Sequence, residues 1–383
     1  MMAKEDNVYR ELQVHLDQHP VGYPKTISGA EIKVLKHIFT PEEAKVATFL
    51  DYRFQPFEAI YEKQASSGYL RDDLKKLLDQ IASKGGIGYR SRDGQYFYCN
   101  MPLVVGMYEG FLDNLTPDFI TDFEKYTGSP AFGISFLSTA VPQMRTIPIA
   151  ESITPDHQVS SFDQVSALIE ESPGPFVVIE CICRKKKAME GERCNVTDRT
   201  ETCLAANETA AAVLAHDMGR EISKQDAIDL LAENTKEGLV LQPSNTQEIE
   251  FVCSCCGCCC GMLSIQKQLP RPLDFWASNY FAVMDMDKCT KCGICARKCQ
   301  VDAITVKKKN KKITQVKLNT KKCIGCGNCV SACKFDAITL VKKDVEAIPP
   351  KTFEELNEIL MKNKKGTWDK VKMVSKMVLG LPQ

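Results

Sequence analysis

The amino-acid sequence predicts an α+β protein of several domains, with its unusual chemistry in the C-terminal half. The length of 383 residues and the mass of 42.8 kDa are enough for two or three domains of roughly 150 residues each. Hydrophobic residues make up 44% of the chain and charged residues 26%, which are ordinary globular values and argue against a disordered or fibrous protein. Of the 19 cysteines, 18 lie between Cys181 and Cys333. We therefore divide the chain into a helical N-terminal domain, a cysteine-rich middle region, a domain with a repeated cysteine motif and a helical tail, at residues 1–100, 101–280, 281–345 and 346–383.

The N-terminal domain is expected to contain helices followed by a β-hairpin. A hydroxyl, a proline and two acidic residues in succession, Thr40–Glu43, predict the start of a helix. Further helices are expected at 57–64 and 70–83, and the second of these has its leucines on one face. Short strands at 87–90 and 95–98 flank an Asp-Gly turn. Three helices followed by a two-stranded wing resemble a winged helix-turn-helix domain.

The middle region is expected to have a mixed α/β structure. An apolar run at 176–179 predicts a buried strand that leads directly to Cys181. The segments 104–108 and 146–149 are expected to be strands or otherwise buried. Helices are expected at 162–171, near 204–216 and at 224–234, the last with Ser223 and Asp226 as a capping box.

The domain at 281–345 carries the most specific pattern, a duplicated C-x2-C-x2-C-x3-C motif in which each copy is followed by Asp-Ala-Ile-Thr. This pattern resembles the two-cluster bacterial ferredoxins, whose four-iron clusters each take three cysteines from one copy and the fourth from the other. The resemblance implies that one [4Fe–4S] cluster binds Cys289, Cys292, Cys295 and Cys333, and the other Cys323, Cys326, Cys329 and Cys299. The proline that follows the fourth cysteine in ferredoxins is replaced here by Gln300 and Lys334. Structural zinc is the alternative, but it normally uses paired C-x2-C knuckles.

Two further groups of cysteines lie in the middle region. Four cysteines within 23 residues follow the buried strand and fit one more metal site, a [4Fe–4S] cluster ahead of zinc or unligated thiols. Six more lie within eight residues, and neighbouring side chains diverge too much for all of them to face one small ion. We therefore expect these six cysteines to bind metal at two sites or at one larger cluster. Any of them that do not bind metal would be buried core cysteines or a reactive thiol pair. The first group is Cys181, Cys183, Cys194 and Cys203; the second is Cys253, Cys255, Cys256, Cys258, Cys259 and Cys260.

The charges balance overall but not along the chain. Lys and Arg together number 49, as do Asp and Glu, yet the chain from Met284 onward has 22 basic and 10 acidic residues. The lysine-rich stretch 307–312 is expected to be a solvated hairpin tip, with docking of an acidic redox partner as the alternative. The wing region at 66–98 has too small a basic surplus to predict nucleic-acid binding. The tail at 352–381 is expected to form two helices broken near 364–366, the second basic and amphipathic and packed on protein rather than membrane.

The beginning of the chain has no apolar signal segment and no stretch predicts a transmembrane helix, so we expect a cytoplasmic location. Dense cysteines in a reducing compartment indicate metal binding rather than disulfides. The sequence contains no phosphate-binding loop, complete dinucleotide fingerprint or hydrolase motif, so no nucleotide site and no hydrolytic nucleophile are expected.

Taken together, the chain resembles a family of 4Fe–4S ferredoxin-like proteins of anaerobic bacteria and archaea. The resemblance implies an electron-transfer protein or subunit that serves a larger oxidoreductase, with one or two [4Fe–4S] clusters beyond the ferredoxin pair. Two alternatives remain, an iron–sulfur redox sensor that regulates transcription through the winged helix, and a reductase subunit whose Cys253–Cys260 cluster meets substrate. The matching segments are His15–Asp17 with Pro20–Pro24, Phe39–Ala44, Cys181–Arg184 and Cys253–Cys260.

Overall fold

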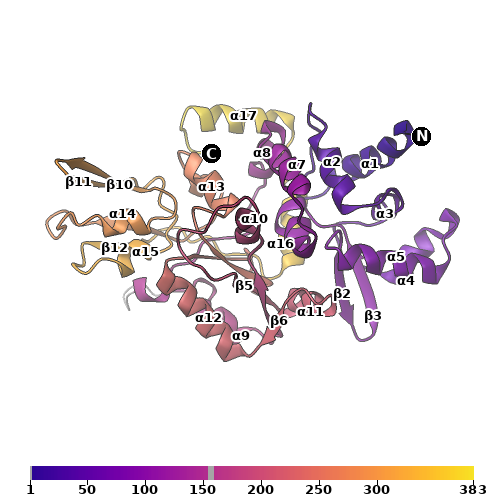
Figure 1. The fold of residues 1–383 in the computed structure, drawn as a ribbon, viewed down its shortest axis with the longest axis horizontal. Coiled ribbons are helices and arrows are strands. Elements are labelled where there is room, and N and C mark those ends of the chain that lie inside the picture. Colours follow the sequence, from indigo (N-terminus) through magenta and orange to yellow (C-terminus); the bar gives the residue numbers. More distant parts are fainter. Residues whose placement is uncertain (1, 154–158) are drawn as a thin grey trace. The chain divides into compact units, whose positions relative to one another are not determined.

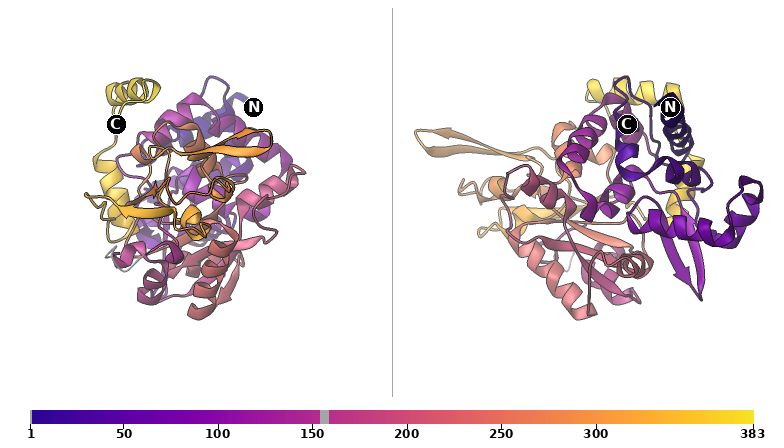
Figure 2. Two further views of the ribbon diagram at one scale, coloured as in Figure 1. Left: turned by 90° about the vertical axis from the view of Figure 1, so that its left-hand side faces the viewer. Right: turned by 45° about the vertical axis from the view of Figure 1, so that its right-hand side comes forward.

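The computed structural model describes residues 2–153 and 159–383, and the chain folds into two compact units. The first unit comprises the residues up to Ala140 together with Ala211–Met218 and Asn357–Val371. The second comprises Val141–Ala210, Gly219–Leu356 and Lys372–Gln383. Figure 1 and Figure 2 show the course of the chain through both units, which are described in turn.

Helices of the first unit start where local signals place them. Thr40 caps α3, because its side chain accepts a hydrogen bond from the Glu43 amide while the Glu43 carboxylate accepts one from the Thr40 amide at 2.7 Å. This confirms the helix start expected at Thr40. In α5, Leu74, Leu78 and Ile81 are fully buried, as their spacing predicted, but Leu70, expected on the same face, precedes the helix as its N-cap and is exposed. The helices are α1 (Met2–Asp17), α2 (Ala30–Ile38), α3 (Pro41–Ala47), α4 (Phe57–Lys63), α5 (Arg71–Ser83), α6 (Tyr108–Gly110), α7 (Pro117–Thr127), α8 (Pro130–Leu137) and, from Asn357 onward, α16 (Phe353–Lys362).

A three-stranded antiparallel sheet follows α5. The expected hairpin is present as β2 (Gly88–Arg92) and β3 (Gln95–Cys99), and Asp93 and Gly94 both have positive φ, as a tight hairpin turn requires. A third strand, β1 (Gln55–Pro56), pairs with β3, so the order is β1–β3–β2. The segment 104–108 is buried at Val104 and Met107 as expected. It forms a helical turn kinked at Val105 and Gly106 rather than a strand.

The second unit is built on a five-stranded sheet with the order β6–β4–β5–β8–β7, in which every adjacent pair is antiparallel. The middle region thus has the mixed helix and sheet structure that we expected, but its antiparallel strands make it α+β rather than α/β in the strict sense. Helices α9 and α12 pack on an apolar cluster that includes Ile169, Phe176 and Leu231. The elements are β4 (Phe176–Glu180), β5 (Glu201–Ala206), β6 (Arg220–Ile222), β7 (Val240–Pro243), β8 (Phe251–Cys255), α9 (Val165–Glu171), α10 (Ile182–Met189), α11 (Asn207–Ala215), α12 (Lys224–Glu237) and α13 (Gly261–Gln268).

The helix expected from Leu204 starts later than predicted. Leu204, Ala205 and Ala206 belong to β5 and pair with β4 on one side, and the first two also pair with β8 on the other. Sheet hydrogen bonds on both sides outweigh the helix preference of alanine, and α11 begins only at Asn207. The helix over 224–234 is confirmed as α12, with Ser223 and Asp226 forming the capping box.

In the C-terminal part of this unit, the two copies of the cysteine motif share the same backbone conformation as well as the same sequence pattern. Lys291 and Gly325 both have positive φ, as do Gly293 and Gly327, each pair at equivalent positions of the two motifs. The short helices that follow each glycine carry the third cysteine of each motif. The elements are α14 (Ile294–Lys298), α15 (Asn328–Ser331), and the antiparallel pairs β9 (Tyr280–Met284) with β12 (Ile338–Lys342) and β10 (Ile304–Lys309) with β11 (Lys312–Leu318).

The tail forms α16 and α17 (Thr367–Val378), with the break near residues 364–366 that the sequence predicted. Trp368, the first large apolar residue of α17, is 86% exposed. Within the residues that the structure describes, no helix is both long and apolar enough to cross a bilayer.

Candidate metal centres

The eight cysteines of the repeated motif line two hollows, four in each. Cys289, Cys292 and Cys295 of the first motif line one hollow together with Cys333 of the second motif. Cys323, Cys326 and Cys329 line the other together with Cys299 of the first motif. The space between the atoms, counting the part open to solvent, is about 330 Å³ in the first hollow and 340 Å³ in the second. The two hollows are thus similar in size, and each is lined by three cysteines of one copy of the motif and one cysteine of the other copy, as in the ferredoxins that the sequence resembles.

Backbone amides point at thiols of the second hollow. The Ala282 amide donates to Sγ of Cys323 at 3.3 Å, and the Ala303 amide donates to Sγ of Cys299 at 3.2 Å. Hydrogen bonds of this kind stabilise negative charge on sulfur and tune the reduction potential of an iron–sulfur cluster.

The two hollows differ in exposure. In the first, Cys292 is exposed and Phe335, which also lines the hollow, is 48% exposed. In the second, Cys323 and Cys329 are buried, and burial raises the pKa of the Cys326 thiol to about 12. Metal binding at the second hollow must therefore release protons from these thiols.

Side-chain amides attach the second hollow to the central cysteine run and to Gly238, the residue that ends α12. Gln300, the residue after Cys299, accepts a hydrogen bond from the Gly257 amide at 2.8 Å and donates to the Gly238 carbonyl at 3.1 Å. Asn328, the residue before Cys329, donates to the same carbonyl at 2.7 Å. Both amide side chains are buried. The replacement of the ferredoxin proline by Gln300 was the one feature of the sequence that pointed to this attachment.

The central cysteines divide differently from the grouping that the sequence suggested. We grouped Cys194 with Cys181, Cys183 and Cys203 because they follow one strand. The structure instead places Cys194 with Cys256, Cys258 and Cys259, and the four sulfur atoms all lie within 4.8 Å of one another. The reason is the loop between α10 and β5, which carries Cys194 away from the strand ends and onto the run after β8. This set of four is called the tetrathiol site below.

The remaining six central cysteines form a closed ring of thiol contacts, called the six-thiol ring below. Side-chain hydrogen bonds join Cys181 to Cys183 and Cys203, and they join Cys260 to Cys183 and Cys255. Cys253 closes the ring through hydrogen bonds to Cys255 and Cys203. The sheet explains these contacts. Cys253 and Cys255 lie two residues apart on β8, so their side chains share a face of the sheet. In the antiparallel pair of β5 and β8, Leu204 lies opposite Val252, and this register places Cys203 opposite Cys253.

Helix geometry favours negative charge at two points of the ring. Cys181 is the N-cap of α10 and Cys260 the N-cap of α13, where the positive end of the helix dipole favours a thiolate. At Cys260 the hydrogen bond from Cys183 acts in the same direction, but the hydrogen bond with Cys255 and burial outweigh both effects, and the pKa of the thiol is raised well above its ordinary value. Hydrogen bonds from Cys183 and Cys203 hold the pKa of Cys181 well below its ordinary value, with a further contribution from the charge of Arg184.

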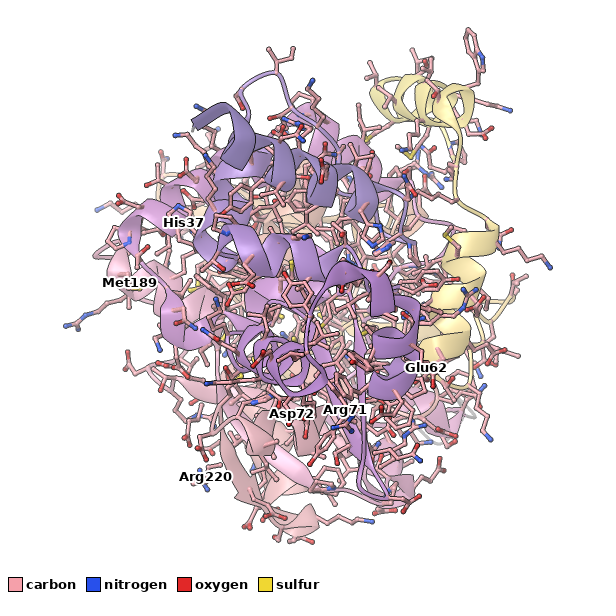
Figure 3. The ribbon with its side chains drawn as sticks, turned by 90° about the vertical axis from the view of Figure 1, so that its right-hand side faces the viewer. His37, Glu62, Arg71, Asp72, Met189 and Arg220 are labelled. Carbon is pink, nitrogen blue, oxygen red and sulfur yellow. The ribbon has the colours of Figure 1, made fainter. Side chains whose placement is uncertain are left out.

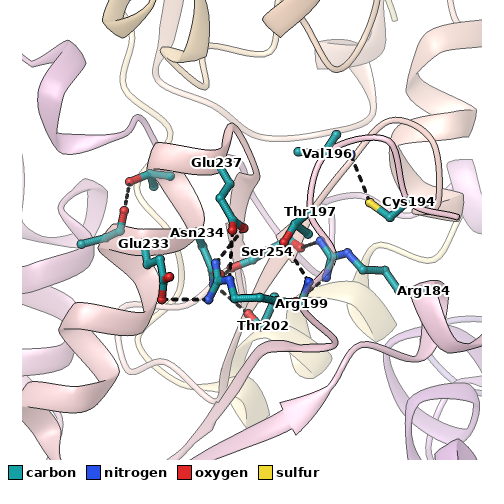
Figure 4. A network of polar contacts seen from close by, with 12 residues as sticks. Arg184, Cys194, Val196, Thr197, Arg199, Thr202, Glu233, Asn234, Glu237 and Ser254 are labelled. Carbon is teal, nitrogen blue, oxygen red and sulfur yellow. Dashed lines mark hydrogen bonds and ion pairs between the residues drawn. The ribbon is translucent and has the colours of Figure 1, made fainter.

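Arg184 lies between the tetrathiol site and the six-thiol ring. Burial by itself lowers the pKa of its guanidinium, but the charges of Cys181, Cys256 and Cys203 and a hydrogen bond to Cys194 raise it above the ordinary value. The guanidinium donates to Oγ1 of Thr202 and to the Ser254 carbonyl, the latter at 2.9 Å. Its Nε has no hydrogen-bond partner among the described residues. A buried cation is thus placed to offset thiolate charge in both sets. Figure 4 shows Arg184 with Cys194 of the tetrathiol site.

A polar network fixes the surroundings of Arg184. Asn234 of α12 donates to the Thr202 carbonyl at 2.9 Å and to Oγ of Ser254 at 2.8 Å. Arg199 in turn donates to Asn234 at 2.7 Å and to Glu237 at 2.8 Å. Figure 4 shows these side chains joining α12 to strands β5 and β8. The nineteenth cysteine, Cys99, belongs to β3 of the first unit and to neither group.

One comparison with known proteins gives a match. Residues 288–337 match the family described as the 4Fe-4S dicluster domain. Curated proteins and solved structures gave no match. The matched segment contains all eight cysteines of the two hollows, and cysteine thiolates are the usual ligands of iron–sulfur clusters. The chain therefore carries a ferredoxin-type iron–sulfur domain, and iron–sulfur electron transfer is the activity that such a domain supports.

Proposed function

We propose that this protein relays single electrons through two [4Fe–4S] clusters of its C-terminal domain, as a component of a larger anaerobic oxidoreductase. Cys289, Cys292, Cys295 and Cys333 would hold the first cluster, and Cys299, Cys323, Cys326 and Cys329 the second. The exchange of the fourth cysteine between the two hollows is the observation that carries the proposal. When bound, such clusters accept and release one electron at a time.

The difference in exposure distinguishes an outer end and an inner end of the relay. The first hollow, with its exposed Cys292, is the end at which an external redox partner can approach. The second hollow has no exposed cysteine and is attached through Gln300 to the central cysteine run, so we assign it as the internal end. The six-thiol ring is the proposed internal donor or acceptor, as a further iron–sulfur site.

The ring favours a relay over direct catalysis. Cys181, Cys255 and Cys260 are buried, and a cluster that reacts with substrate needs an accessible iron position. The reductase alternative is therefore the weaker one.

The surface of the hairpin β10–β11 suits an acidic redox partner. Lys307, Lys308, Lys309, Lys311 and Lys312 are all exposed at its tip. Complementary charge of this kind steers transient encounters and loses its effect in salt. We propose a cytoplasmic redox protein, or another subunit of the complex, as this partner.

We propose that residues 1–100 include a winged-helix-like domain that serves docking rather than DNA binding. The order α3–β1–α4–α5–β2–β3, with the sheet order β1–β3–β2, supports this fold. Two of the three cations of α5 are engaged in ion pairs, because Arg71 contacts Glu58 and Asp72, and Lys75 contacts Asp79 at 2.6 Å. Figure 3 shows Arg71 beside Asp72 at the start of this helix. Paired cations contribute little to phosphate binding, so the transcription-regulator alternative is disfavoured.

Iron analysis of anaerobically purified protein tests the relay. We expect at least about eight iron atoms per chain, and the loss of about four in each of the variants Cys292→Ala and Cys326→Ala. Cys99→Ala is the matched control and should keep its iron. Fewer than about eight irons in fully loaded protein, or zinc in the two hollows, would contradict the proposal.

A further inference from the structure

The tetrathiol site differs in size from every other group of cysteines in the described chain. Sγ of Cys194 lies 3.6 Å from Sγ of Cys256 and 3.7 Å from Sγ of Cys258, and Sγ of Cys258 lies 3.6 Å from Sγ of Cys259. No other set of three or more metal-ligating side chains among the described residues is this compact. The thiols of the two ferredoxin-type hollows and of the six-thiol ring are thus more widely spread.

These distances fit one metal ion. A tetrahedral zinc ion with four thiolates at about 2.3 Å has sulfur–sulfur edges of about 3.8 Å. Three of the six sulfur–sulfur edges, at 3.6–3.7 Å, differ from that value by 0.1–0.2 Å, and all six are within 4.8 Å. An iron–sulfur cube places its ligand sulfurs around four metal atoms rather than one, so it needs a wider set of thiols than this.

We propose that Cys194, Cys256, Cys258 and Cys259 bind a single structural zinc ion, separate from the iron–sulfur sites. The site offers four thiolates and is closed by protein ligands, as structural zinc sites are. The tetrathiol site joins parts of the chain that are 62 residues apart, from Cys194 to Cys256. Zinc bound here therefore fixes the loop after α10 onto the run that follows β8.

Two further features fit thiolates at this site. The backbone amide of Val196 donates to Sγ of Cys194 at 3.5 Å. The backbone amide of Asn195 donates to Sγ of Cys258 at 3.4 Å. Four thiolates on one zinc ion leave a net charge of minus two, which the buried guanidinium of Arg184 partly offsets through Cys194 and Cys256.

The position of the site gives it a role. Cys255 and Cys260 of the six-thiol ring lie on either side of the Cys256–Cys259 segment in the sequence. Zinc at the tetrathiol site would hold the backbone between these two ring cysteines, and so would preorganise the ring without taking part in electron transfer.

Metal analysis of the full chain, purified anaerobically, tests this inference. We expect one zinc per chain in the wild type, and loss of that zinc in Cys258→Ser and Cys194→Ser. The electron paramagnetic resonance signals of the ferredoxin-type clusters should persist in both variants. Cys99→Ser should change neither zinc nor iron. Because those signals are recorded in the same samples, failure of the zinc assignment is distinguishable from failure of the proposed relay.

A measurement on the wild type covers the case in which a variant fails to fold. X-ray absorption at the zinc edge should show four sulfur neighbours at about 2.3 Å. Three results would overturn the inference: loss of about four irons in Cys258→Ser, one tightly bound iron in place of zinc, or ready alkylation of all four thiols in the native protein.

Discussion

Alanine at Gly325 is expected to damage the second hollow, whereas alanine at the equivalent Lys291 is not. Both residues have positive φ, at 71° and 59°. At Gly325 a Cβ atom would lie 2.3 Å from the carbonyl oxygen of Tyr280 and 2.6 Å from Oγ of Ser278. Lys291 already carries a Cβ atom in the same conformation. The two repeats thus supply a matched pair in which only one position is sterically closed.

The cost at Gly325 has two parts. The left-handed conformation costs alanine about 1–2 kcal/mol. Overlap with a backbone carbonyl that has to move adds about 1–3 kcal/mol, so the total is about 2–5 kcal/mol. Tyr280 begins β9, and two residues later the Ala282 amide donates to Sγ of Cys323. The strain therefore falls on a strand that supports a ligand of the second hollow.

Anaerobic urea unfolding, followed by the visible absorbance of the clusters, measures the effect. We expect Gly325→Ala to lower the free energy of unfolding by about 2–5 kcal/mol and to release iron from the second hollow first. Lys291→Ala should change stability by less than about 0.5 kcal/mol. Equal stability and equal iron content in the two variants would refute this reasoning.

Three further predictions concern buried charge and the central cysteines. Arg184→Gln should lower the reduction potential of a cluster in the six-thiol ring by about 40–90 mV, because removing one positive charge at roughly 8–16 Å costs the reduced cluster about 1–2 kcal/mol. A redox titration measures this shift, and Arg184→Lys is the control that keeps the charge. Unchanged potentials in Arg184→Gln would contradict the prediction. Cys255→Ser should lower iron but not zinc, the reverse of Cys258→Ser, and loss of both metals from either variant would show that the two sites are one. Arg145→Met should cost about 3–5 kcal/mol at neutral pH, because it leaves the buried carboxylate of Asp163 without its cation. Burial raises the pKa of Asp163, so this deficit should shrink as the pH falls and the carboxyl becomes neutral, and a deficit that does not depend on pH in urea titrations would contradict it.

The sequence predicted the elements whose signals are local. Thr40 and Ser223 carry complete capping boxes, and both helices start there. Asp93-Gly94 satisfies the turn between β2 and β3 by itself. Within each copy of the repeated motif, successive cysteines are separated by only two or three residues, so their spacing carries nearly all of the information about the two hollows.

The arrangement of the ten central cysteines could not be predicted in the same way. The contact of Cys203 with Cys253 depends on the pairing of β5 with β8, two strands that lie about fifty residues apart in the chain. The position of Cys194 depends on a loop without regular structure. Periodicity describes neither of these long-range relations, and the shift of Leu204 from the expected helix to a strand has the same origin.

Gln300 shows how a departure from a familiar motif can have a structural reason. Proline, which follows the fourth cysteine in ferredoxins, has no side-chain donor or acceptor. Gln300 uses both ends of its amide, toward Gly257 and Gly238, and leaving these buried groups unsatisfied would cost about 1–3 kcal/mol each. Gly257 cannot be replaced easily either, because a Cβ atom there would lie 2.2 Å from the Gln300 carbonyl oxygen. The proposed second cluster is thereby connected to the central cysteines through Gln300, which follows Cys299 in the chain and accepts a hydrogen bond from the Gly257 amide. An isolated ferredoxin has no use for such a connection, whereas a relay that passes electrons inward requires a fixed distance at this point.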